Sequence, residues 1–114
     1  MAVFMKVPDI KGPATTPGYE GYIELLSVEG NGNPMAGGLD STITELLCSR
    51  ETDDATISLV RATSSGQIFG EVTIDVVKGY RITVRFAKFT SFTANQDGLE
   101  KFTMDFNNYS IEKI

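Results

Sequence analysis

The chain has 114 residues, a formal net charge of −5 and 41% hydrophobic residues, which fits one globular domain spanning residues 1–114. It contains no histidine and a single cysteine, so histidine-based catalytic pairs, imidazole metal sites and an intramolecular disulfide are excluded. Its lysines and arginines are scattered, and no apolar run approaches the ~20 residues of a membrane-spanning helix, so we expect neither nucleic-acid binding nor membrane insertion.

The first part of the chain predicts two strands separated by a loop. Residues 2–7 alternate, with Val3, Met5 and Val7 on one face and Phe4 on the other. Residues 11–18 contain two prolines and two glycines, which indicates a loop. Residues 22–28 alternate again with apolar residues on both faces, as expected for a single strand that is covered on both sides.

The segment EGNGNPMAGGLD, residues 29–40, is an open, glycine-rich loop directly after the second predicted strand. It has two interpretations: a passive connection between strands, or an arm that becomes ordered against another subunit. Glycine permits close approach of backbones but loses much conformational entropy when it is ordered, so a contact role requires a partner. The residues alone favour the passive connection.

The middle of the chain predicts one strand and the one short helix. In the strand, residues 41–49, Cys48 is expected to be a small buried hydrophobic residue. The helix is expected over residues 52–66, with Asp53 or Asp54 capping its start and Gly66 ending it. Its core-facing side is formed by Ala55, Leu59 and Ala62.

The last part predicts a hairpin and a final strand. Residues 67–77 place Ile68, Val72, Ile74 and Val76 on one face and Phe69, Glu71, Thr73 and Asp75 on the other. A turn at Lys78-Gly79 leads into residues 80–92, so that Glu71 and Asp75 can pair with Arg81 and Arg85 across the hairpin.

After a turn at residues 94–98, residues 100–114 form one more alternating run. The fold class that follows is mainly β: an antiparallel β-barrel or sandwich with one short α-helix on the side.

Catalysis is a weak alternative in this pattern. Glu71 and Asp75 are two carboxylates on one strand face, and such a pair can in principle perform acid–base chemistry. Charged residues that alternate along a strand more often form a wetted surface, so we expect these side chains and their arginine partners to lie on a solvated sheet face. The sequence therefore predicts no catalytic residues, no metal site and no cofactor.

The ordered set of motifs resembles the haemolysin-coregulated proteins, Hcp, of the bacterial type VI secretion system. The opening MAVFMKVPDIKG carries the Asp-x-x-Gly pattern at Asp9 and Gly12, and YIELLSV is similar to the next family strand. ATISLVRATSSGQIFGEVTIDVV, with its Ser-Ser-Gly at the helix end, is similar to the family's helix and following strand. RITVRFAKFTSFTA and LEKFTMDFNNYSIEKI resemble the closing strands. Family members usually continue into a further strand beyond the position of Ile114, so an open sheet edge is expected here.

This resemblance implies a structural function rather than an enzymatic one. It implies hexameric rings that stack into a hollow tube, carry effector proteins, contact other secretion-system components, and leave the bacterial cytoplasm without an N-terminal signal peptide. It also favours the contact role for the glycine-rich loop, as a ring-stacking segment. That segment consists of Gly30, Asn31, Gly32, Asn33, Pro34, Met35, Ala36, Gly37 and Gly38. Two alternatives stay open: a phage-like tail-tube protein, and a monomeric Hcp-like carrier or adaptor for an effector.

Overall fold

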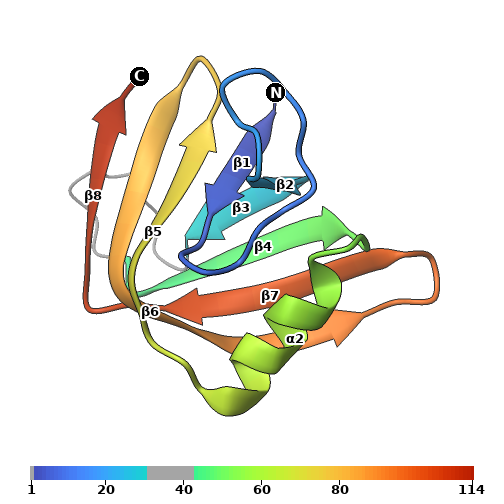
Figure 1. The fold of residues 1–114 in the computed structure, drawn as a ribbon. Helices are drawn as coiled ribbons and strands as arrows, with labels where there is room; N and C mark the ends of the chain where they lie inside the picture. Colours follow the sequence, from blue (N-terminus) through green and yellow to red (C-terminus); the bar gives the residue numbers. More distant parts are fainter. Residues whose placement is uncertain (1, 31–42) are drawn as a thin grey trace.

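The computed structural model describes residues 2–30 and 43–114, and this part of the chain forms eight strands and one helix (Figure 1). The elements in chain order are β1 (Val3–Lys6), β2 (Ile23–Leu25), β3 (Ser27–Gly30), β4 (Glu45–Glu51), α2 (Thr56–Ser65), β5 (Phe69–Val76), β6 (Tyr80–Ala94), β7 (Leu99–Asp105) and β8 (Asn108–Lys113).

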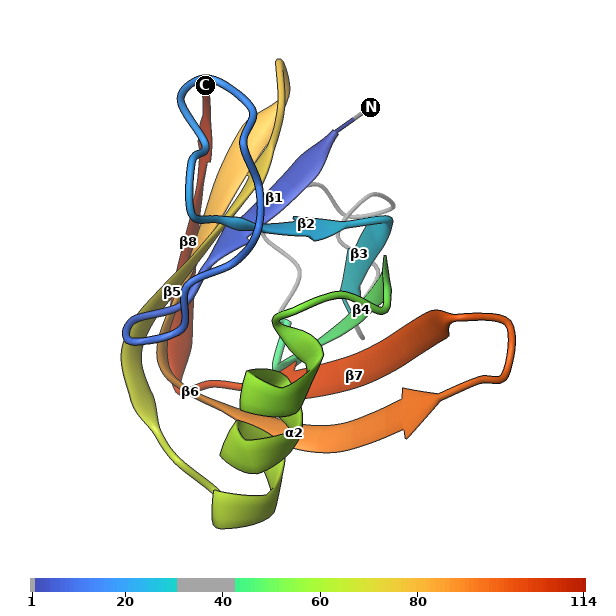
Figure 2. The same cartoon turned by 45° about the vertical axis from the view of Figure 1, so that its right-hand side comes forward.

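The strands form one antiparallel sheet that is folded into two layers. The order is β2-β1-β5-β6-β7-β4-β3, and β8 pairs with β6 outside this path. The first half of β6 pairs with β5 and β8, whereas its second half pairs with β7. Figure 2 shows that the layer of β5, β6 and β8 runs steeply across the layer of β4 and β7. The mainly β, sandwich-like fold expected from the sequence is confirmed.

The long strand β6 belongs to both layers because it bends near its middle. Phe86 adopts a left-handed backbone conformation with φ of 55°, and the pairing with β7 shifts register between Phe89 and Ser91. Irregularities of this kind turn a strand and re-aim its side chains. The alternation predicted for residues 67–77 is wrong at its start, next to this bend. Ile68 is 62% exposed, while Phe69 is buried against Phe89.

Two predicted strands are each divided into two. The strand expected over residues 22–28 breaks at Leu26, which is 52% exposed and whose N–H donates to the Ser49 carbonyl at 2.7 Å. The two halves, β2 and β3, lie at opposite ends of the sheet path, and Leu26 is the one residue between them in the chain. The run expected over residues 100–114 is also interrupted, between β7 and β8. The described strands thus form a sandwich whose ladder is not closed into a continuous barrel.

The helix α2 covers one open end of the sandwich (Figure 2). Its predicted inward side is confirmed, since Ala55, Leu59 and Ala62 are buried. Gly66 ends the helix in the left-handed conformation, with φ of 68°, as predicted. The helix begins later than predicted, at Thr56, and its N-cap residue, Ala55, makes no side-chain capping bond. The predicted role of Asp53 is nevertheless confirmed, because its Oδ1 accepts a hydrogen bond from the Ala55 N–H at 2.8 Å.

The loop between β1 and β2 packs over the outer side of the first layer. Tyr19 stacks on Phe4 with ring centroids 4.5 Å apart, so Phe4 is buried although it lies on the face opposite Val3 and Met5. The Asp-x-x-Gly pattern starts this loop, because Asp9 has φ of 67° and aspartate tolerates that conformation better than bulkier residues do. Gly12 packs so closely that an added Cβ would lie 2.1 Å from the Tyr22 carbonyl oxygen.

Candidate assembly surfaces

The base of the glycine-rich segment is tightly packed. Gly30 is the last residue of β3, and a Cβ at this position would lie 3.1 Å from Cγ2 of buried Ile43. Gly30 also lies opposite Leu46 in the β3–β4 ladder, so the described residues on either side of the segment are close together. Of the nine residues predicted to stack rings, only Gly30 is described; residues 31–38 lie outside the described residues.

Three strands present an edge to which a further strand can bind. Within residues 2–30 and 43–114, β2 pairs only with β1, β3 only with β4, and β8 only with β6. Unpaired backbone N–H and C=O groups along such edges are ready to bind a strand from another chain. Edges of this kind suit assembly of copies of one chain.

The outer face of the first layer carries charges that pair with one another. The two ion pairs predicted across the hairpin are present, with Arg81 Nε 2.6 Å from Asp75 Oδ1 and Arg85 Nε 3.8 Å from Glu71 Oε2. Arg81 also approaches Glu112 of β8 at 4.0 Å. Of these side chains, all but Asp75 line a polar hollow of about 690 Å³.

Asp75 corrects the prediction of a fully solvated face, because its side chain is only 1% exposed. It lies opposite Phe4 on β1 and hydrogen-bonds with Tyr19 of the covering loop. The hydrogen bonds from Arg81 hold the pKa of Asp75 below its ordinary value, although burial opposes this shift. Burial and the contact with Asp75 raise the pKa of Tyr19. A carboxylate that is stabilised in its ionised form and already bonded is a poor general base.

A buried charged cluster joins the second layer to α2, and sequence reasoning missed it. Arg50 and Glu100 are fully buried and lie opposite each other on β4 and β7, with Nη1 2.6 Å from Oε1. Asp53 accepts a further bond from Arg50, and Thr56 donates to Glu100 at 2.7 Å. A signal was present: Arg50 shares the inward face of β4 with Leu46 and Cys48.

The single cysteine is confirmed as a buried core residue. Cys48 is completely buried in β4, and burial raises the pKa of its thiol to about 12. A thiol with so high a pKa carries almost no thiolate near neutral pH, so it is inert.

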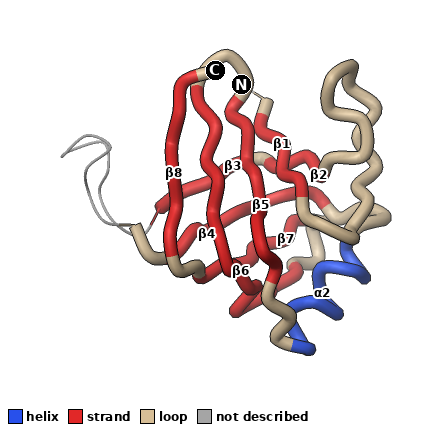
Figure 3. The backbone as a smooth tube through the Cα atoms, turned by 60° about the vertical axis from the view of Figure 1, so that its left-hand side comes forward, coloured by secondary structure: helices blue, strands red, loops and turns tan. Residues whose placement is uncertain are grey.

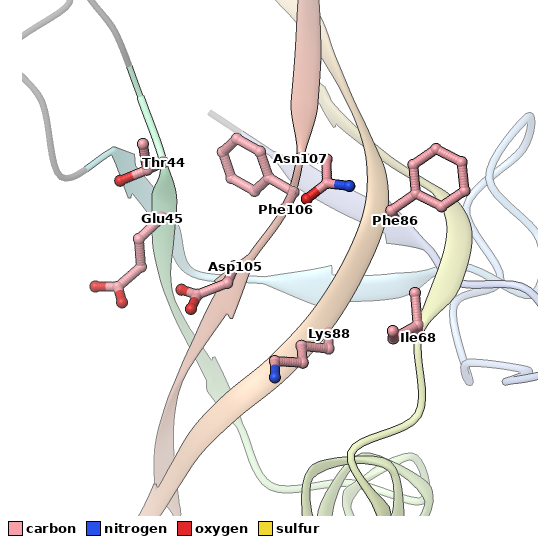
Figure 4. A pocket seen from close by; sticks show the side chains of 8 residues that line it. All are labelled: Thr44, Glu45, Ile68, Phe86, Lys88, Asp105, Phe106 and Asn107. Atoms are coloured by element: carbon pink, nitrogen blue, oxygen red, sulfur yellow. The ribbon is translucent and has the colours of Figure 1, made fainter.

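A hollow of about 620 Å³ lies where β6 bends, and we call it the corner hollow. Its lining residues are Thr44, Glu45, Ile68, Phe86, Lys88, Asp105, Phe106 and Asn107. Figure 4 shows Phe86 and Ile68 together on one side of it, and Thr44 and Glu45 on the other. Phe86 is 56% exposed despite its size, and Ile68 is exposed beside it.

The outer face of α2 is a second exposed apolar surface. Ile57 is 60% exposed and Val60 is 38% exposed, and they lie about one turn apart on the side opposite Leu59 and Ala62. Arg61 is exposed next to them, and no ion pair to it is found among the described residues. We call Ile57, Val60 and Arg61 the helix face.

Other kinds of site are not found in the described part of the chain. No group of three or more aspartate, glutamate or cysteine side chains there is arranged to hold a metal ion. The one described helix is too short and too polar to cross a membrane. The features that remain are strand edges, two exposed apolar surfaces and the base of the glycine-rich segment.

Comparison with known proteins matches this chain to a protein family. The family model described as "Type VI secretion system effector, Hcp" matches residues 4–112. No curated protein sequence matches the chain.

Solved structures show that the fold is shared over almost the whole chain. Hcp2 from Salmonella typhimurium is 19% identical with a TM-score of 0.81, over 100% of this chain and 86% of its own. A type VI secretion system effector from Yersinia pestis is 13% identical with a TM-score of 0.80, over 98% of this chain and 88% of its own. A tube-terminating cap of an anti-feeding prophage is 10% identical with a TM-score of 0.63, over 98% of this chain and 88% of its own.

Proposed function

The chain belongs to the Hcp family of the type VI secretion system, whose members are structural tube subunits, and from this premise we propose that six copies form a ring and that rings stack into a hollow tube. The observation that carries the proposal is the family match over residues 4–112, together with a fold shared along nearly the full length of Hcp structures. In this proposal the whole chain, residues 1–114, acts as one tube domain.

The surfaces of the molecule support assembly rather than catalysis. The carboxylates Glu71 and Asp75 are paired with arginines, and Cys48 is buried and inert. Exposed apolar side chains and strand edges, in contrast, are the features that bind another protein chain. We therefore assign this chain no catalytic step. Its partners in the proposal are its own copies, other secretion-system components and the effectors that the tube carries.

The glycine-rich segment, Gly30 to Gly38, is proposed to contact the neighbouring ring. The described residues that flank the segment, Gly30 and Ile43, lie close together at the edge of the sandwich. An arm that starts at a fixed point and contains many glycines can follow the surface of a neighbouring subunit closely. We also propose that the protein leaves the bacterium by ejection of the tube itself.

Electron microscopy of the purified protein tests this function. Negatively stained wild type is expected to show hollow rings and, at high concentration, stacked tubes. A variant that lacks residues 31–38 but keeps Gly30 and Ile43 is expected to form single rings that do not stack. A second variant with a glycine–serine segment of the natural length separates the effect of length from that of sequence. Tubes of normal length in both variants would contradict the stacking role.

A further inference from the structure

The corner hollow and the helix face have the properties of two halves of one contact. A ring with cyclic symmetry uses head-to-tail contacts, in which each subunit presents two different surfaces that are complementary to each other. Figures 1 and 3 show α2 on one side of the molecule and the turn between β7 and β8, which borders the corner hollow, on the other. The two surfaces are thus separate, as a head-to-tail contact requires.

The corner hollow combines exposed apolar area with unusual backbone geometry. Phe86 holds a left-handed conformation, which is rare for a bulky residue, and exposes more than half of its side chain. The left-handed conformation serves the bend of β6, but the exposure of the ring does not help the isolated subunit, because the ring remains in water. The exposure is explained when Phe86 becomes buried against a partner.

The charges on the two surfaces are complementary. Glu45 and Asp105 outnumber Lys88 in the lining of the corner hollow, so its net charge is negative. The helix face carries the positive charge of Arg61 beside Ile57 and Val60. An apolar contact surrounded by opposite charges is the arrangement typical of protein–protein interfaces.

We propose that the helix face of one subunit docks into the corner hollow of the next copy of this chain in the ring. Ile57 and Val60 pack against Phe86 and Ile68, and Arg61 faces Asp105. This contact rests on the ring proposed above, since it names the surfaces through which the ring closes.

Disulfide cross-linking tests the contact, because Cys48 is buried and introduces no background reaction. In a double variant, Ile57→Cys with Phe86→Cys, oxidation is expected to link each subunit to the next and to give a ladder that ends at six chains. The single variants are expected to give no ladder, because a head-to-tail contact never brings two copies of the same position together. Ile57→Cys with Tyr80→Cys is the control: Tyr80 lies six residues from the bend, about 20 Å along β6.

Charge reversal gives a second and independent test. Arg61→Glu is expected to shift the protein from rings to monomers, and Arg61→Glu with Asp105→Arg is expected to restore the rings. Lys78→Glu, an equal change in charge at the far end of the β5–β6 hairpin, is expected to leave the rings intact. Circular dichroism of each variant checks that the subunit is folded.

The outcomes distinguish the contact from the ring itself. Intact rings without a ladder in the double variant, or rings unaffected by Arg61→Glu, would overturn the contact and leave the ring standing. A wild-type protein that stays monomeric at high concentration would overturn the ring, and the contact with it.

Discussion

Arg50 and Glu100 face each other across β4 and β7 with no exposed surface, and their charged atoms are 2.6 Å apart. Asp53 and Thr56 bind to the same pair, so the cluster connects two strands of the second layer to the first turn of α2. The two charges satisfy each other away from water, and neither is stable there alone.

Removal of Glu100 is therefore expected to destabilise the subunit strongly. Glu100→Ala leaves the buried Arg50 guanidinium with Asp53 as its remaining carboxylate partner, and the loss of one partner of a buried pair costs about 3–5 kcal/mol. Urea unfolding followed by circular dichroism measures this loss. Glu71→Ala is the matched control, since its 3.8 Å pair with Arg85 is exposed and contributes at most about 1 kcal/mol. Equal losses in the two variants would contradict the structural role of the cluster.

The pair of Asp75 and Arg81 predicts a dependence of stability on acid. The pKa of Asp75 is lower in the folded protein than in the unfolded chain, where it is about 4. Its contribution is thus fully present above that value and is lost as the pH falls through the lowered folded pKa. Asp75→Asn lacks this titration, so the difference in unfolding free energy between wild type and variant is expected to shrink below about pH 4. A difference that is constant between neutral and acidic pH would refute the assignment.

Cys48 is expected to be unreactive in the folded protein. Its thiol is buried and its pKa is raised to about 12, so a thiol reagent at neutral pH finds neither access nor thiolate. Reaction with a chromogenic disulfide is expected to be negligible in buffer and to reach one thiol per chain in denaturant. Rapid reaction of the native protein would show that β4 is not in the core.

Two glycines are expected to respond differently to alanine. A Cβ at Gly12 would lie 2.1 Å from the Tyr22 carbonyl oxygen, and overpacking of this kind costs about 1–3 kcal/mol or more. A Cβ at Gly70 meets nothing within 4 Å, so Gly70→Ala is expected to be neutral or to stabilise by up to about 1 kcal/mol. Thermal unfolding of both variants measures the contrast. A fully stable Gly12→Ala would mean that the loop after β1 packs differently.

The hairpin of β5 and β6 shows what the sequence predicts well. Alternation predicted both strands apart from the start of β5, the Lys78-Gly79 turn determined their register, and the two cross-strand ion pairs followed from that register. The buried side of α2 and the end of this helix at Gly66 were equally predictable from the sequence. These features depend on residues that are close together in the chain, where period and turn chemistry decide the structure.

The features that the sequence did not predict depend on contacts between distant residues. The break at Leu26 is set by its bond to Ser49, and the burial of Asp75 is set by Tyr19 of the covering loop. Phe86 looks like an ordinary strand residue in the sequence, and only the fold shows that β6 bends there. The ring-stacking segment remains a prediction, since residues 31–38 lie outside the described part.

The mass of the purified protein in solution tests the central claim most directly. Size-exclusion chromatography with light scattering is expected to show a species of about six times the 12.4 kDa of one chain. That species should persist on dilution to the micromolar range. A single species of 12.4 kDa at every concentration would contradict the claim that this chain is built to assemble with its own copies.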